Sequence, residues 1–219
     1  MNRRVRYQVA VSLDGFIAGP NGEYDWIVMD PAIDFAALFK EFDTAVMGRK
    51  TYEVLTAQGG HGALPGLEVV VFSRTLRPAT HPGVRILNDD PRDVVAALKA
   101  KPGRDIWLYG GGGFFRSLLD AGLVDTVEVA VVPVLLGSGV PLLPPGAATK
   151  LTLADQKTLS ASGIVALSYS IPGGVGPAPR IGYVKAAKAG SKKNASTVAK
   201  LAKRAPKRPA RANRPLRDT

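Results

Sequence analysis

Runs of apolar residues, several of them rich in β-branched side chains, recur along the first 172 residues and predict buried β-strands. The first run covers residues 5–13, and the glycine-punctuated segment after it, up to Trp26, is predicted to be a loop. The remaining predicted strands cover residues 44–47, 67–72, 84–87, 106–109, 126–132, 151–159 and 164–171.

Other segments carry apolar residues at helical spacing. Residues 34–42 have apolar side chains at positions 35, 38, 39 and 42, which predicts an amphipathic helix. Further helices are predicted from Gly48 to position 55, over residues 91–100, and after a glycine run to position 121. Pro91 is the first residue of its helix, where its missing N–H does no harm.

Strands that alternate with helices are typical of an α/β domain with a parallel sheet. The last two predicted strands have no helix between them, so the sheet is expected to end antiparallel. We therefore predict a three-layer α/β domain with a mostly parallel central sheet over residues 1–172.

A second segment, residues 173–219, has a different composition. Residues 176–219 hold 13 of the 29 Lys and Arg residues but one of the 18 acids, so the net charge of +11 comes from this tail. Because it has few large apolar residues, the tail is predicted to be disordered. Two functions remain open: a salt-sensitive tether to nucleic acid or another anionic surface, or a solubilising appendage without a dedicated partner. Without Phe or Trp, sequence-specific recognition is not expected.

The residue inventory excludes several kinds of chemistry. The absence of cysteine excludes disulfides, thiolate nucleophiles and cysteine-ligated metals. The two histidines, His61 and His81, lie in loops and are predicted to be solvated, so no metal site is expected. No Walker A or G-x-S-x-G motif occurs. No apolar run approaches the roughly eighteen residues of a membrane span, which predicts a cytoplasmic protein without membrane contact.

The sequence DIWLYGGGGFFRSLL, residues 105–119, predicts a strand, a glycine loop and a helix. Four consecutive glycines (Gly110, Gly111, Gly112 and Gly113) let a bulky anion approach the backbone, and the helix that follows directs free N–H groups at the same place. The segment is interpreted as a cradle for nucleotide phosphates, with a tight strand–helix turn as the alternative.

Three more predicted strands end in residues that suit a ligand. Asp14 and Gly15 follow the first strand, and Gly48, Arg49, Lys50 and Thr51 follow the second. Arg49 and Lys50 begin a helix, where cations are disfavoured unless an anion binds there. Ser73 and Arg74 follow the third strand and suit a phosphate monoester, although they could also form an exposed turn. In a parallel sheet these strand ends share one edge, where ligands bind. The predicted site has phosphate contacts but no nucleophile, metal or histidine base. Such a site favours a reaction whose chemistry is carried by the cofactor, such as hydride transfer.

Four motifs, in this order, resemble those of the dihydrofolate reductase-like superfamily: SLDGFIA at residues 12–18, MGRKTYE at 47–53, YGGG at 109–112 and VPVLLGSG at 132–139. Within that superfamily they resemble most the RibD C-terminal reductase domain and its small stand-alone members. The resemblance covers roughly residues 4–172.

The resemblance implies an NADPH-binding fold with a mostly parallel eight-stranded sheet, in a branch whose members are commonly homodimers. It implies that Ala10 and Ile17 lie beside the nicotinamide. Ser73 and Arg74 would face the adenosine 2′-phosphate, which favours NADPH over NADH. The other cofactor phosphate contacts would come from Gly48, Arg49, Lys50 and Thr51, with Gly110, Gly111, Gly112 and Gly113 at the pyrophosphate.

The candidate catalytic residues are three acids. Dihydrofolate reductases place a substrate-binding carboxylate a few residues beyond a tryptophan that Trp26 resembles. The spacing differs here, and both Asp30 and Asp34 lie nearby. Either could be an exposed acid, and Asp34 could cap the predicted helix. Asp14 could contact the substrate or shape its loop.

The sequence therefore predicts an NADPH-dependent reductase of a small heterocycle, pterin-like or pyrimidine-like. The resemblance implies chemistry of the 5-amino-6-(5-phosphoribosylamino)uracil reductase or dihydrofolate reductase type. The alternative is a nucleic-acid-associated protein whose reductase-like body binds a nucleotide without turnover.

Overall fold

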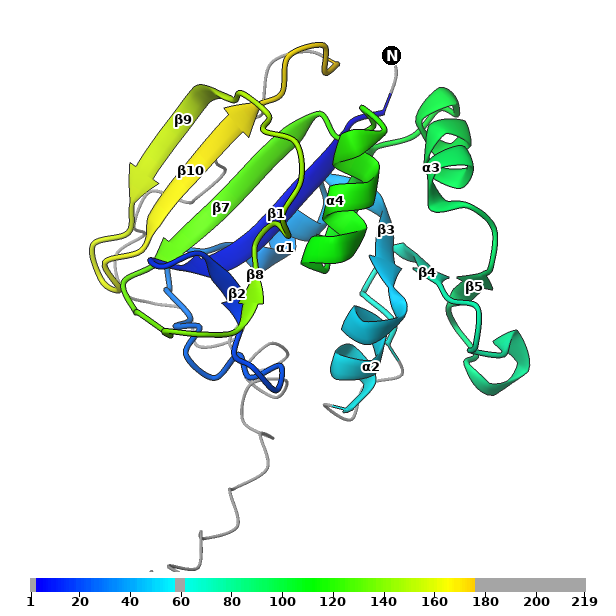
Figure 1. Cartoon of the computed structure of the whole chain (residues 1–219), viewed down its shortest axis with the longest axis horizontal. Helices are drawn as coiled ribbons and strands as arrows, with labels where there is room; N and C mark the ends of the chain where they lie inside the picture. Colours follow the sequence, from blue (N-terminus) through cyan, green and yellow to red (C-terminus); the bar gives the residue numbers. More distant parts are fainter. Residues whose placement is uncertain (1–2, 58–61, 176–219) are drawn as a thin grey trace, which may run out of the picture.

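The computed structural model describes residues 3–57 and 62–175, and its centre is an eight-stranded sheet of order β5-β4-β3-β6-β1-β7-β10-β9 (Figure 1). From β5 to β7 neighbouring strands are parallel, whereas β10 is antiparallel to both β7 and β9. The prediction of a mostly parallel sheet with an antiparallel end is therefore confirmed. The strands are β1 Val5–Ser12, β3 Phe42–Gly48, β4 Glu68–Phe72, β5 Arg85–Leu87, β6 Asp105–Gly110, β7 Thr126–Val132, β9 Thr152–Thr158 and β10 Val165–Ser170.

Helices cover both faces of this sheet because its strands carry apolar side chains on both sides. In β6, Ile106 and Leu108 face one core cluster while Trp107, between them, faces another. The first cluster includes buried residues of α3, Pro91–Ala100, and α4, Gly112–Asp120. The second includes residues of α1, Phe35–Phe39, and α2, Arg49–Ala57. A short 3₁₀ turn, η1 Pro78–Thr80, precedes β5.

Helix α1 is shorter than the helix predicted over residues 34–42. It begins as expected after Asp34, whose carboxylate accepts a hydrogen bond from the backbone N–H of Ala37 at 3.0 Å. It ends at Phe39, however, because Phe42 is the first residue of β3 and stacks on Trp107 with ring centroids 5.1 Å apart. Position 42 is apolar whether it continues the helix or begins the strand, so periodicity could not locate the boundary.

Two very short strands were not predicted. Strand β2, Phe16–Ala18, lies within the segment predicted to be a loop and pairs with β8, Val140–Pro141. Beside this pair the N–H of Leu142 donates to the carbonyl of Gly15 at 2.9 Å. We call residues 134–147 the strap, because this segment runs from the end of β7 past β2 and then alongside α4 (Figure 1).

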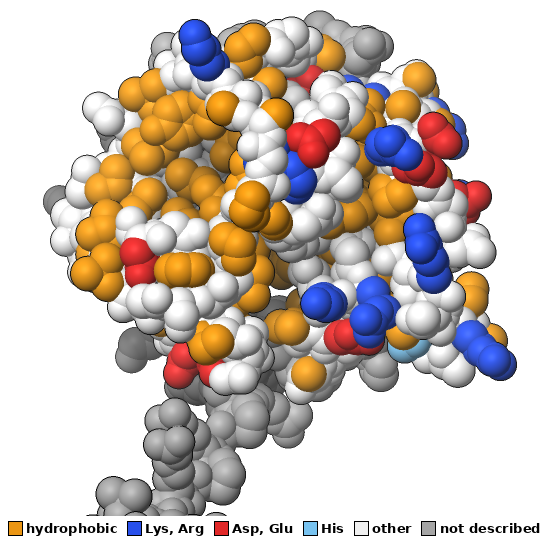
Figure 2. Space-filling view, viewed as in Figure 1, with side chains coloured by type: hydrophobic (Ala, Val, Ile, Leu, Met, Phe, Trp, Pro, Cys, Tyr) orange, Lys and Arg blue, Asp and Glu red, His pale blue; other side chains and the backbone are white. Residues whose placement is uncertain are grey.

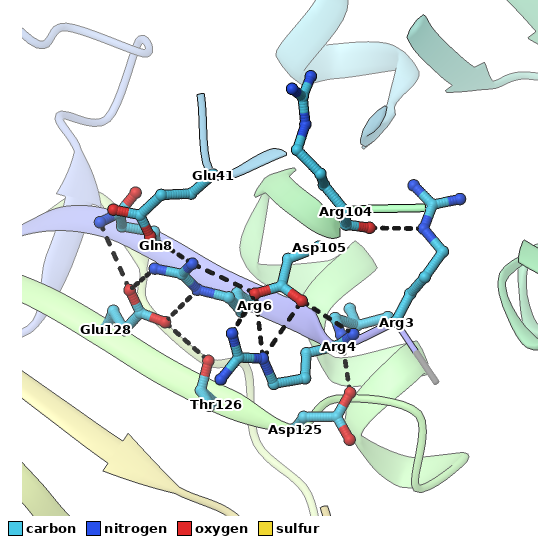
Figure 3. Close-up of polar contacts among 11 residues, drawn as sticks. Arg3, Arg4, Arg6, Gln8, Glu41, Arg104, Asp105, Asp125, Thr126 and Glu128 are labelled. Atoms are coloured by element: carbon cyan, nitrogen blue, oxygen red, sulfur yellow. Dashed lines mark hydrogen bonds and ion pairs between the residues drawn. The ribbon is translucent and has the colours of Figure 1, made fainter. Parts of the chain in front are cut away.

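The amino-terminal ends of the parallel strands form the amino edge of the sheet, where charged side chains are paired. Arg6 in β1 donates two hydrogen bonds to the carboxylate of Glu128 in β7, at 2.8 and 2.7 Å, and one to Glu41 at 2.5 Å. Arg4 forms an ion pair with Asp105 in β6 at 2.6 Å. Figure 3 shows Arg6 lying between Glu128 and Asp105, so β1 is held to both of its neighbours.

Candidate functional site

Three neighbouring strands, β4, β3 and β6, end at one edge of the sheet, and each is followed by a predicted anion-binding segment (Figure 1). Arg74 follows β4, Arg49 opens α2 directly after β3, and the glycine run follows β6. Side-chain packing draws these segments together. The ring of Phe114 in α4 stacks on Phe72, with centroids 5.3 Å apart, and its Cβ lies 3.7 Å from where a Cβ on Gly48 would be. We call this the carboxyl edge.

The glycine run leads directly into α4. Gly110 has a φ of +146°, which suits glycine, and the Gly110–Gly111 peptide bond is cis. Gly111 is the N-cap of α4, so no side chain caps the helix, and its first turn carries no acid. A Cβ on Gly113 would meet nothing within 4 Å. This helix start therefore offers uncapped N–H groups and a partial positive charge on an open side, which fits a phosphate.

The start of α2 lies beside the glycine run, since the hydroxyl oxygen of Thr51 is 3.3 Å from where a Cβ on Gly111 would be. Arg49 pairs with Glu53 at 2.7 Å, but both side chains are more than 40% exposed (42% and 46%). Such a surface pair contributes at most about 1 kcal/mol, so an incoming anion can compete for Arg49. Lys50 is exposed, and Figure 2 shows Lys and Arg side chains over α2 and the neighbouring strand ends.

Ser73 and Arg74 form a turn after β4. Ser73 is buried, and its Oγ accepts hydrogen bonds from the N–H groups of Thr75 and Leu76 at 3.2 and 3.0 Å. The serine therefore shapes the turn, and its hydroxyl also shares a hydrogen bond with that of Thr75 at 3.4 Å. Arg74 is exposed and forms no ion pair with any residue of the described ranges.

The residues predicted to lie beside the nicotinamide do not share a core cluster. Ala10, near the end of β1, packs against the cluster that includes Trp26. Ile17, in β2, packs against the cluster beneath α4. Both residues lie near the carboxyl-terminal end of β1, but they pack against different core clusters.

All three candidate acids accept hydrogen bonds from backbone amides. Asp34 caps α1, as described above. Asp14 accepts hydrogen bonds from Ser12 Oγ at 2.6 Å and from the N–H groups of Leu136 and Gly137 at 3.0 and 2.7 Å. The serine hydroxyl and the two amides lower the pKa of Asp14. Asp14 therefore joins the loop after β1 to the strap, which supports the loop-shaping interpretation.

Asp30 differs from the other two acids because it is 4% exposed. Its Oδ1 accepts a hydrogen bond from the N–H of Ala32 at 2.8 Å, and its Oδ2 has no hydrogen-bond partner among the described residues. Burial raises the pKa of Asp30, but the neighbouring polar groups of Ser162 and Ala32 outweigh this effect and the net shift is downward. Asp30 is thus the candidate acid whose second oxygen is buried without a hydrogen-bond partner among the described residues.

Residues 3–57 and 62–175 contain no cluster of three or more His, Asp or Glu residues that could hold a metal ion, and no helix long and apolar enough to cross a membrane. His81 differs from its prediction as a solvated residue, because it is only partly exposed and shares a hydrogen bond with the Tyr52 hydroxyl at 3.1 Å. His61 lies outside the described residues.

The body of the chain is similar to a known protein family. The model of the RibD C-terminal domain matches residues 3–165, which is most of the body. The chain belongs to the RibD C-terminal domain family. The predicted resemblance is therefore confirmed. A relative in Bacillus subtilis, the uncharacterized protein YyaP, is 35% identical over 179 residues, covering 76% of this chain and 94% of its own.

Longer family members align only in part. The riboflavin biosynthesis protein RibD of Mycobacterium tuberculosis is 30% identical over 154 residues, which are 62% of this chain but 44% of that protein. Among solved structures, a putative riboflavin biosynthesis protein from Shewanella sp. PV-4 has a TM-score of 0.67 at 25% identity and covers 78% of this chain and 99% of its own. A deaminase/5-amino-6-(5-phosphoribosylamino)uracil reductase of Thermotoga maritima, with a TM-score of 0.58 at 16% identity, shows the shared fold.

Proposed function

We propose that this protein is an NADPH-dependent reductase that transfers a hydride to a small pterin-like or pyrimidine-like heterocycle. The observation that carries the proposal is the carboxyl edge, where an uncapped helix start and several exposed cations follow three neighbouring strands. The names of relatives add support, because they include a uracil-derivative reductase and riboflavin biosynthesis proteins.

The phosphate end of the cofactor fits the residues present. The N–H groups at the start of α4 would bind the pyrophosphate, and Arg49 and Lys50 would neutralise its charge. Arg74 would contact the 2′-phosphate that distinguishes NADPH from NADH. The bound cofactor would supply the hydride.

The proton that completes such a reduction needs a protein group or a water molecule near the substrate. Asp30 is our candidate, because its buried Oδ2 has no partner among the described residues and a substrate N–H could donate to it. Its pKa is lowered, so Asp30 is ionised near neutral pH and would not itself donate the proton. A water molecule would deliver the proton, and Asp30 would orient the ring and stabilise the positive charge that develops on it.

Calorimetric titration with NADPH and NADH tests the proposal. The wild-type protein should prefer NADPH, and Arg74→Ala should lose about tenfold or more of that preference because one charge-assisted phosphate contact is removed. Arg77→Ala is the matched control, since Arg77 is also exposed and lies three residues away. Failure of the wild type to bind either nucleotide would refute the proposal. A panel of pterins and pyrimidines, screened for NADPH oxidation, would identify the substrate.

The tail carries an independent proposal, the tethering of the protein to nucleic acid. It rests on the 13 cations of residues 176–219, which lie outside the described residues. Electrophoretic mobility shifts at increasing salt should show weak binding of the full chain that falls steeply with salt. Binding that persists after residues 176–219 are deleted would exclude the tail as its source.

We also propose that the protein is a homodimer. Among the described residues no helix covers the face of the sheet formed by β7, β9 and β10 on the α4 side (Figure 1), and Figure 2 shows hydrophobic side chains gathered there. On this face Leu153 is 49% exposed and Leu167 is partly buried. Light scattering should give twice the chain mass, and Leu153→Asp should yield monomers, whereas Leu13→Asp should not.

A further inference from the structure

We propose that Arg116 is a positioning residue for the cofactor: it clamps the strap to α4 and so holds the phosphate cradle at a set distance from the loop after β1. The inference rests on the proposed NADPH binding. It assigns a role to a side chain that contacts neither the predicted cradle residues nor the candidate acids.

Arg116 lies in α4, one turn beyond the glycine run, and its side chain is 13% exposed. Its Nε and Nη2 donate to the carbonyl of Pro144 at 3.3 and 3.0 Å, and Nη1 donates to the carbonyl of Ala147 at 3.1 Å. Asp120, one turn further along α4, pairs with Nη1 at 3.0 Å. A single guanidinium thus binds two carbonyls of the strap, and Asp120 helps to hold its orientation.

The same strap touches the first turn of α4. A Cβ on Gly112 would lie 2.5 Å from the carbonyl oxygen of Pro141 and 3.1 Å from that of Leu142. Position 112 therefore needs glycine because the strap backbone occupies the space, whereas a Cβ on Gly113 would be unobstructed. The two glycines, predicted to have the same role, face different surroundings.

The other end of the strap is fixed to the loop after β1. Asp14 accepts from the N–H groups of Leu136 and Gly137, and β2 pairs with β8 as described above. A Cβ on Gly139 would collide with the carbonyl of Ala18, so the two backbones are in close contact. The strap is thus joined at one end to the segment containing Ile17 and at the other to the helix that forms the cradle.

These contacts make the strap a cross-link between the two ends of the proposed cofactor site. The α4 side is anchored in the core by Phe115, Leu118 and Leu119, which are all buried. Without Arg116 the cradle should remain, but its distance from the loop after β1 would no longer be set. Binding of an extended cofactor would then include the cost of restoring that distance.

The test compares NADPH with adenosine 2′,5′-bisphosphate, which carries the 2′-phosphate and one 5′-phosphate but lacks the nicotinamide half. In Arg116→Met, the dissociation constant for NADPH should rise about tenfold and that for the bisphosphate should change less than about twofold. Hydrogen exchange without any ligand should accelerate at the amides of Leu136 and Leu142. Arg116→Lys, which keeps the charge but not the fork, should show a smaller version of both effects.

The matched control is Arg92→Met, because Arg92 is exposed and pairs with a helix-end acid, Asp90, far from the strap in sequence. It should change neither binding nor exchange. Equal weakening of both ligands by Arg116→Met, or no weakening with unchanged exchange, would overturn the inference. A wild-type protein that binds neither ligand would instead refute the proposed function, and this inference with it.

Discussion

At the amino edge of the sheet Arg6 is 3% exposed and its guanidinium is shared between Glu128 and Glu41, whereas at the carboxyl edge Lys50 and Arg74 are exposed. Neither Lys50 nor Arg74 forms an ion pair within the described ranges. A buried charge is tolerated only when it is paired, so the amino-edge charges serve the fold. Exposed, unpaired cations beside an uncapped helix start cost little folding free energy, because they stay hydrated, and they are available to a ligand. Burial and pairing therefore distinguish the charges that stabilise the fold from those that can bind a ligand.

The largest effect should come from breaking a pair at the amino edge. Arg6→Met leaves the carboxylate of Glu128 buried without its main partner and should lower the free energy of unfolding by about 3–5 kcal/mol. Urea denaturation would measure the loss. Arg85→Met, at an exposed pair with Glu68, is the control and should change stability by about 0.5 kcal/mol or less. Similar losses in the two variants would show that burial does not distinguish them.

The next effect concerns catalysis and the proposed role of Asp30. Asp30→Asn keeps an oxygen to accept from Ala32 but removes the charge, and should reduce kcat about 100-fold once a substrate is known. The dissociation constant for NADPH should change little. Steady-state kinetics and calorimetry measure the two quantities. Asp34→Asn, at a helix cap, is the control, and an equal loss of kcat there would contradict the assignment of Asp30.

A smaller effect tests the phosphate cradle without disturbing the strap. Gly113→Ala places a methyl group in open space and replaces glycine in a helix, so stability should rise by up to about 1 kcal/mol. The same methyl group would obstruct a phosphate at the helix start, and NADPH binding should weaken about tenfold. Thermal unfolding and calorimetry should therefore move in opposite directions. Unchanged NADPH binding would place the pyrophosphate elsewhere.

The smallest effect is pH dependence at Asp14. Because its pKa is lowered in the folded protein, its ionised form stabilises the fold above the pKa of the unfolded chain, and this contribution is lost as the pH falls through the folded-state value. Asp14→Asn should therefore be less stable than wild type at pH 7, and the gap should close in acid. Urea titrations at pH 7 and pH 3 measure both. A gap that is the same at both pH values would contradict the pKa shift.

Much of the fold was predictable because its signals are local. The predicted ranges 91–100 and 126–132 coincide with α3 and β7, whose apolar periodicity and Pro91 lie within the elements themselves. The glycine run likewise indicated the turn into α4. Strands β2 and β8 went unpredicted because three and two residues are too short to show a period, and they exist through their mutual pairing.

The candidate site was predictable to a similar extent. The positions of Arg49, Arg74 and the glycines follow from strand ends in a parallel sheet, so their convergence could be expected. The difference between Gly112 and Gly113 could not, because it depends on a strap backbone some thirty residues away. Nor could the sequence choose among Asp14, Asp30 and Asp34, since the burial and hydrogen bonds that distinguish them come from other segments.

The amino-acid pattern alone was sufficient for the α/β class, most element positions and the family, because hydrophobic periodicity and short motifs are properties of contiguous residues. The pairing of Arg6 with Glu128, the clamp of Arg116 on the strap and the burial of Asp30 emerged only in the folded chain. Each joins residues far apart in sequence, and such contacts depend on which strands become neighbours in the sheet.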